Sequence, residues 1–248
     1  PSFRTLRSSV LGLTATECEP LWMAKSQRGD TAFGGNMRHA AYAIRATRNP
    51  GALKSIVSDF RKNEIVGRDW HTALRLISEM GDGAAQDVLF ELAFATDRLT
   101  TPQRQDIIDA LERAAARKKP RPQHPERLLE LFRVHDEGIL SSAARLAGRW
   151  QLEEAIDRLS EFALSDLTTE HLREAAIDGL AWIGNKRSTD LLVRVTERNP
   201  SAKFRAKAVI GLSGIDIGLS AHPAFPHIAS ASCRAPVSIS VVSVSFPH

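Results

Sequence analysis

Three pairs of carboxylates recur along the middle of the chain, and the two members of each pair are four residues apart. The pairs are Asp87 with Glu91, Glu126 with Glu130, and Asp157 with Glu161. Residues four apart share one face of an α-helix, so each pair would present two negative charges side by side, at a cost of roughly 0.2–0.5 kcal/mol. We expect this acidic ridge to bind a protein partner through a basic segment.

The first member of each pair also has a simpler explanation. Asp87, Glu126 and Asp157 lie near expected helix starts, where a negative charge interacts favourably with the helix macrodipole. This effect falls off within the first turn, so it does not account for the second member. Helix stabilisation and partner binding therefore both remain as explanations.

The motifs that enzymatic catalysis would require are absent. The sequence contains no HExxH, GxSxG, Ser-x-x-Lys, GxxxxGK[ST] or GxGxxG pattern. Its eight histidines are scattered, and Cys18 and Cys233 form neither CxxC nor CxxCH, which excludes covalent haem and the common zinc spacings. We therefore expect no catalytic residues, no metal ligands and no cofactor.

The acidic pairs belong to a repeat with a period near 33 residues. In the clearest copy, Ala176, Leu180 and Ile183 form an apolar helical face, Gly184-Asn185 breaks the helix, and a second apolar face follows. Spacings of 32 to 36 residues separate the first core positions of successive copies. These positions are Ala40, Ala73, Ile107, Ala143, Ala176 and Ala208. The pattern predicts helical hairpins, with the acidic pairs on the second helices.

Local signals predict where these helices begin and end. Gly81 and Gly184 suit left-handed C-caps, and Thr101 before Pro102 suits an N-cap. The third copy departs most from the pattern, because Arg117-Lys118-Lys119-Pro120-Arg121-Pro122 lengthens its turn and no glycine closes its first helix.

The pattern Ala-x-x-x-Leu-x-x-Ile-Gly-Asn from Ala176 to Asn185, echoed from Ala73 to Asp82, resembles the HEAT repeat, in particular the short HEAT-like repeat of bacterial proteins. The resemblance covers about residues 37–216. It implies an all-α fold, a right-handed α-α superhelix of about six hairpins in which the second helices line the concave side. Tetratricopeptide and ankyrin repeats share the period but not these residues.

Two segments lie outside the expected array. We expect residues 1–36 to contain a degenerate N-terminal capping hairpin, since terminal repeats are usually atypical. Residues 217–248 contain no Asp, Glu or Lys, one Arg, seven Ser and four Pro. We expect this segment to be an irregular, low-complexity C-terminal tail, either disordered or foreign to the array.

The charge balance is mild, with 33 Lys and Arg against 29 Asp and Glu. A net charge of +4 does not indicate nucleic acid, and no apolar run is long enough to cross a bilayer. Basic residues gather on the expected first helices and turns: Arg38, Arg45, Arg48, Arg145, Arg149, Lys203, Arg205, Lys207 and the cluster from Arg113 to Arg121. That cluster either contacts phosphate or lipid headgroups or is a solvated loop.

An extended repeat surface without catalytic motifs predicts a non-catalytic scaffold or docking segment for protein-protein interaction. Similar HEAT stretches occur in large multidomain bacterial proteins with a haem module. We expect a cytoplasmic location by default, and a periplasmic one if the chain is a fragment of such a protein. The alternative is a DNA-binding array such as the DNA-alkylation-repeat glycosylases, which have a similar architecture and use tryptophans and a carboxylate. Trp70, Trp150 and Trp182 invite that comparison, although Trp150 occupies a core column. The oligomeric state stays open.

Overall fold

The computed structural model describes residues 16–27, 36–48, 51 and 53–219. Over these residues the chain forms eleven α-helices and two 3₁₀ helices and contains no strand. The expected all-α fold is therefore confirmed.

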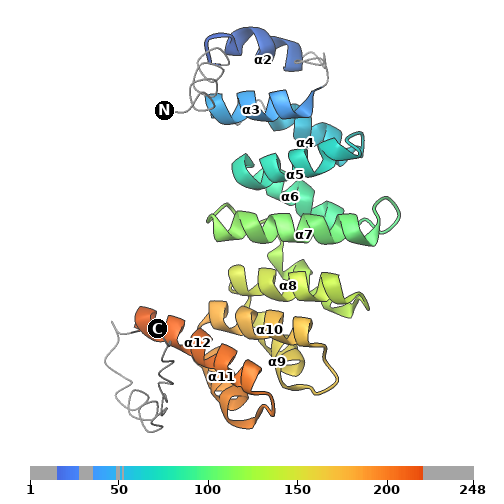
Figure 1. The fold of residues 1–248 in the computed structure, drawn as a ribbon. Coiled ribbons are helices and arrows are strands. Elements are labelled where there is room, and N and C mark those ends of the chain that lie inside the picture. Colours follow the sequence, from blue (N-terminus) through green and yellow to red (C-terminus); the bar gives the residue numbers. More distant parts are fainter. Residues whose placement is uncertain (1–15, 28–35, 49–50, 52, 220–248) are drawn as a thin grey trace, which may run out of the picture.

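The helices pair into hairpins that stack in two layers (Figure 1). The pairs are α3 (Met37–Thr47) with α4 (Leu53–Arg61), α5 (Arg68–Met80) with α6 (Gly83–Ala93), α7 (Thr101–Ala116) with η3 (Pro125–Arg133), α8 (Glu137–Arg149) with η4 (Glu153–Ala155) and α9 (Ile156–Leu164), and α10 (Glu170–Ile183) with α11 (Lys186–Arg198). The helix α12 (Ala202–Leu219) begins a sixth unit, and α2 (Glu19–Gln27) precedes α3. This arrangement is the predicted α-solenoid.

The first helices form one continuous layer, because α3, α5, α7, α8, α10 and α12 each contact the next. Five of the six predicted first core positions, all except Ala40, are completely buried. Leu180 and Trp150 are also buried, as the repeat pattern predicts. Alanine at most of these positions allows neighbouring first helices to approach closely.

Short polar side chains begin most of the helices. Their oxygens accept hydrogen bonds from backbone N–H groups of the first turn, which have no partner within the helix. The capping residues are Asn36, Asp82, Thr100, Asp136, Thr169 and Asn185. The predicted cap at Thr101 is wrong by one residue: Thr100 caps α7, because from there it forms a reciprocal capping box with Gln103.

The two glycines that end first helices do so in different ways. Gly184 adopts the left-handed conformation at φ 63°, as predicted. Gly81 does not, since its φ is −58° and Asp82 immediately caps the next helix. A Cβ atom on Gly81 would lie 2.5 Å from the carbonyl oxygen of Ile77 and 2.9 Å from Cβ of Ala85, so crowding is what requires glycine there.

The ends of the array are described in part. Helix α12 continues to Leu219, three residues into the segment 217–248, and residues 220–248 lie outside the described residues. At the other end, α2 is described but residues 1–15 and 28–35 of the predicted capping hairpin are not. Within α2, Met23 packs against the core whereas Leu21 is 72% exposed.

The closest approach between hairpins joins α8 to α10. A Cβ atom on Gly148 would lie 2.5 Å from Cα of Gly179, and one on Gly179 would lie 2.6 Å from the carbonyl oxygen of Ala144. Both contacts are with backbone, which cannot move aside as a flexible side chain would. These two glycines therefore set the distance between the fourth and fifth hairpins.

Replacement of Gly179 with alanine should lower the free energy of unfolding by about 1–3 kcal/mol, because the added methyl group overpacks this contact. The matched control is Gly214→Ala in α12, where nothing lies within 4 Å of the new Cβ atom and the better helix propensity of alanine should raise stability by up to about 1 kcal/mol. Urea unfolding followed by circular dichroism measures both. Equal effects of the two substitutions would show that α8 and α10 are not in backbone contact.

Candidate interaction surfaces

The six carboxylates of the predicted ridge lie on three consecutive second helices, as the repeat pattern predicts. We call this set the acidic strip: Asp87 and Glu91 on α6, Glu126 and Glu130 on η3, and Asp157 and Glu161 on α9. Five of the six residues are exposed, and Asp87 is partly buried. The strip thus follows the stack from the second to the fourth hairpin.

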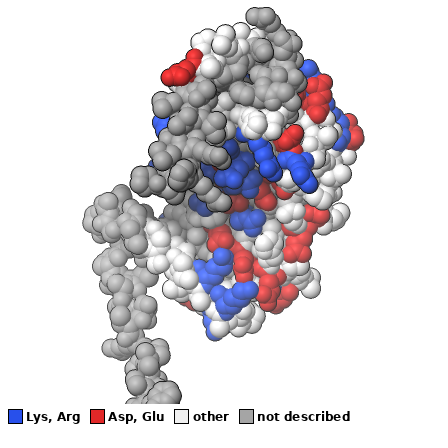
Figure 2. All heavy atoms as spheres, turned by 45° about the horizontal axis from the view of Figure 1, so that its top comes forward, with Lys and Arg blue, Asp and Glu red and all other residues white. Residues whose placement is uncertain are grey.

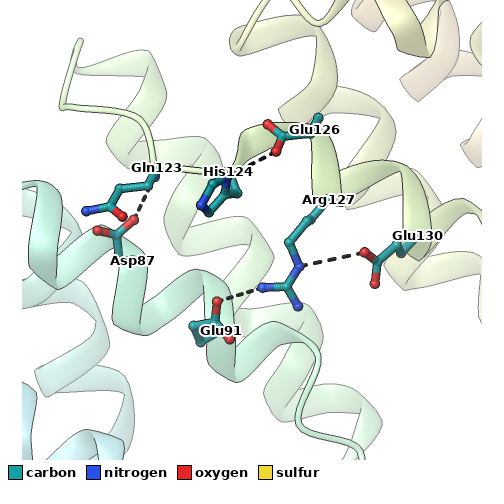
Figure 3. Close-up of polar contacts among 7 residues, drawn as sticks. All are labelled: Asp87, Glu91, Gln123, His124, Glu126, Arg127 and Glu130. Atoms are coloured by element: carbon teal, nitrogen blue, oxygen red, sulfur yellow. Dashed lines mark hydrogen bonds and ion pairs between the residues drawn. The ribbon is translucent and has the colours of Figure 1, made fainter.

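Arginine side chains cross-link this strip. These arginines were not among the residues predicted from the sequence. Arg127 of η3 donates a hydrogen bond of 2.6 Å to Glu91 of α6, and its Nε lies 3.6 Å from Glu130 (Figure 3). Its guanidinium group also lies over the ring of Phe94, 4.8 Å from the centroid. The guanidinium charge lies between Glu91 and Glu130 and offsets their repulsion, which explains how the second members of these two pairs are tolerated.

The other carboxylates also have partners within the chain. Asp87 accepts a hydrogen bond of 2.8 Å from the backbone N–H of Gln123, and Glu126 lies 3.2 Å from the His124 ring (Figure 3). Asp157 pairs with Arg187 of α11, and Glu161 pairs with Arg158 of its own helix. Three arginines against six carboxylates leave the strip a formal charge of −3.

In the C-terminal half, most basic residues of the first-helix layer are neutralised by the hairpin before them. Arg145 of α8 lies 3.1 Å from Glu112 of α7 and 3.8 Å from Asp109. Arg149 is 3.9 Å from the same Glu112. Arg173 and Arg205, the exceptions, donate hydrogen bonds to backbone carbonyl groups.

Lys203 and Lys207 of α12 repeat this arrangement against α10. Lys203 lies 2.7 Å from Glu174 and 2.9 Å from Glu170, and Lys207 lies 2.8 Å from Asp178. The hydrogen bond from Lys203 lowers the pKa of Glu174, and the two glutamates raise the pKa of Lys203 above its ordinary value. These lysines therefore carry little uncompensated charge.

In the N-terminal half, by contrast, the structure brings together basic residues that are far apart in the sequence. Three adjoining depressions lie on α3, α5 and the end of α7. Each of the residues Arg45, His71, Arg75 and Glu79 lines two of the three. We call the three depressions together the basic groove. Its charged and titratable lining consists of Arg38, Arg45, Arg48, His71, Arg75, Glu79, Asp106, Arg113, Arg117 and Lys119. The only sign of this convergence in the sequence is the presence of basic residues in neighbouring copies of the repeat.

One partly buried carboxylate, Glu79, pairs with two arginines of the groove. Arg45 and Arg75 donate hydrogen bonds of 2.8 and 2.9 Å to the two oxygens of Glu79, whose side chain is 18% exposed. Burial alone would raise the pKa of Glu79, but the hydrogen bonds and charges of the two arginines outweigh it and hold the pKa below its usual 4.5. Glu79 therefore stays ionised and fixes both arginines.

The three tryptophans considered for a DNA-repair site do not offer free ring faces. Trp70 is 3% exposed and stacks on Phe60 with ring centroids 4.3 Å apart. Trp150 is likewise 3% exposed, which confirms its place in the core. Trp182 is partly buried, and the Arg149 guanidinium lies over its ring, 3.5 Å from the centroid.

Within the described part of the chain, no group of three or more His, Cys, Asp or Glu side chains is arranged to hold a metal ion. None of the helices described there is long and apolar enough to span a membrane.

Stacked pairs of helices in two layers define an α-solenoid. Residues 125–213, from η3 into α12, match the family model described as HEAT repeats, so the HEAT resemblance is confirmed and HEAT repeats form this part of the chain. HEAT repeats are generally protein-interaction or scaffold elements and are typically non-catalytic. No curated protein matches the chain.

Replacement of Glu79 with glutamine should lower the free energy of unfolding at neutral pH by roughly 0.5–2 kcal/mol, because it weakens two arginine pairs that each contribute up to about 1 kcal/mol. Because the folded-state pKa of Glu79 is depressed, its ionised form stabilises the fold above pH 4.5, and this contribution disappears as the pH falls through the folded-state value. The difference between wild type and variant in urea unfolding should therefore shrink between neutral pH and about pH 3. A difference that does not change with pH would contradict the arrangement.

Proposed function

We propose that the chain is a non-catalytic protein-interaction scaffold whose acidic strip receives a basic segment of a partner protein. The observation that carries the proposal is the alignment of six carboxylates on three consecutive second helices, with a formal charge of −3 after their arginine partners are counted. The HEAT resemblance implies that second helices line the concave side of the array, where an extended partner would lie.

The strip retains capacity for further hydrogen bonds. Glu91 and Glu130 are 61% and 56% exposed in their side chains, and Asp157 is 73% exposed. The contact of 3.6 Å between Arg127 and Glu130 is too long for a good hydrogen bond, so the carboxylate of Glu130 can accept one from a partner. A lysine or arginine of the partner could therefore join the existing ion pairs without breaking them.

The proposal also covers the case in which the chain is a docking segment of a larger multidomain protein, because the strip would bind a partner in the same way there. The HEAT repeats of residues 125–213 and the absence of a metal-binding cluster among the described side chains support a non-catalytic role. The burial of Trp70 and Trp150 and the covered ring of Trp182 argue against a glycosylase that would use these rings around an extruded base.

Reversal of charge along the strip should abolish binding of a basic peptide. We expect a fluorescent Lys- and Arg-rich peptide to bind the full chain, and the triple variant Glu91→Lys, Glu130→Lys, Glu161→Lys to bind it at least about tenfold more weakly because attraction becomes repulsion. Fluorescence anisotropy at physiological salt measures both affinities. Helix content should not change, since exposed substitutions usually alter stability by less than about 0.5 kcal/mol.

The matched control reverses three exposed carboxylates outside the strip, Glu64→Lys, Asp97→Lys and Glu197→Lys, with the same change in net charge. It should lose much less affinity than the strip variant. An equal loss in both variants would show that net charge, and not the strip, attracts the peptide. Release of an alkylated base from DNA by the purified chain would overturn the non-catalytic proposal itself.

A further inference from the structure

The basic groove carries more basic than acidic side chains. Its three depressions have volumes of about 370, 320 and 440 Å³. Seven Lys and Arg side chains line them, against only Glu79 and Asp106. Figure 2 shows this distribution, with Lys and Arg gathered near the centre of the visible face and interspersed with Asp and Glu below.

The net positive charge of the protein is concentrated in this groove. Without the seven basic residues of the groove and its two carboxylates, the rest of the chain has 26 Lys and Arg against 27 Asp and Glu. The protein is therefore close to neutral outside the groove, and its formal charge of +4 reflects this one surface.

Most of the groove cations have no acidic partner. Glu79 is shared by Arg45 and Arg75. The ion pairs that join described residues include none made by Arg38, Arg48, Arg113, Arg117 or Lys119. This is the opposite of the α8, α10 and α12 surface, where neighbouring hairpins pair Arg145, Lys203 and Lys207 with carboxylates.

We infer that the basic groove on α3, α5 and α7 is a second docking surface, which binds an acidic, Asp- or Glu-rich segment of a partner protein. Glu79 already shows the chemistry, because its two carboxylate oxygens each receive a hydrogen bond from a different groove arginine. Guanidinium groups suit carboxylates, since their planar donors form strong charge-assisted hydrogen bonds. This surface is distinct from the acidic strip and does not depend on it.

The size of the groove favours a peptide over a nucleic acid. Packed helices lie 8–10 Å apart, so three first helices span roughly 16–20 Å, the length of about five or six extended residues. A DNA duplex bound through its phosphates would continue past this length, and beyond α7 it would meet the neutralised surface of Asp109, Glu112 and Arg145.

The chain itself supplies no acidic segment that could fill the groove from the residues outside the described part. Residues 1–15 and 220–248 contain no Asp or Glu, and residues 28–35 contain a single acid, Asp30. None of these segments therefore supplies the complementary charge.

The test uses the full chain and a fluorescent oligo-glutamate peptide, with anisotropy measured at physiological salt. The groove variant carries Arg38→Gln at the start of α3 and Arg113→Gln and Arg117→Gln at the end of α7. It should bind the peptide about tenfold more weakly or worse, because three unpaired cations are removed from the groove. The matched control is Lys186→Gln, Arg194→Gln and Arg198→Gln. It removes the same charge from one position at the start and two near the end of α11.

The control triple variant should bind the peptide nearly as well as the wild type. Equal binding by the groove variant and wild type, or equal losses in the two triple variants, would overturn the inference. A single-stranded DNA of equal charge that binds more tightly than the peptide, and loses affinity with the groove substitutions, would also overturn it and make the groove a nucleic-acid site. Unchanged circular dichroism ensures that all variants are folded.

Glu79→Gln provides a test of opposite sign. Glutamine in place of the internal carboxylate frees Arg45 and Arg75 and removes a negative charge from the groove floor, so peptide affinity should rise severalfold. A variant that merely damages the fold would instead lose affinity. The strip variant Glu91→Lys, Glu130→Lys, Glu161→Lys should leave oligo-glutamate affinity unreduced, so that failure of the acidic strip and failure of the groove can be told apart.

Discussion

The close stacking of first helices is the constraint on which the rest of the structure depends. Small residues one repeat apart, such as Ala143 and Ala176, are completely buried, and Gly148 and Gly179 bring two backbones into contact. This stacking fixes the register between hairpins. Because the register is fixed, a side chain on one hairpin meets the residue about 33 positions away on the next.

Charge pairing between hairpins follows from that register. Arg145 reaches Glu112 across 33 residues, Arg45 reaches Glu79 across 34, and Arg127 reaches Glu91 across 36. Exposed pairs of this kind each contribute little stability, up to about 1 kcal/mol. Their larger effect is on the surface, because they remove charge where pairs form and leave it where one partner is missing. The acidic strip and the basic groove are two such places among the described residues.

The sequence predicted the fold because the fold depends on a periodic core. The small or aliphatic residue that opens each copy, from Ala73 to Ala208, is enough to place the helices and the core. The left-handed cap at Gly184 could be predicted in the same way, from local chemistry. Gly81 could not, because its glycine is required by contact with Ile77 and Ala85 and not by its own backbone conformation.

The surfaces were less accessible to prediction from the sequence. The acidic pairs were visible because their spacing is local. The arginine partners of Glu91 and Asp157, by contrast, lie about one repeat away and are recognisable only once the hairpins are in register. The groove combines residues from Arg38 to Lys119, and which of them remain unpaired depends on the positions of Glu79 and Asp106. The periodic pattern of the sequence does not show which groove cations lack a carboxylate partner.

We propose that this solenoid carries two oppositely charged docking surfaces on different layers of helices. Hydrogen–deuterium exchange of the full chain, measured separately with an acidic and a basic peptide, distinguishes the two surfaces. We expect the acidic peptide to slow exchange in α3, α5 and the end of α7, and the basic peptide to slow exchange in α6, η3 and α9. Protection of the same helices by both peptides, or of neither set, would contradict this proposal.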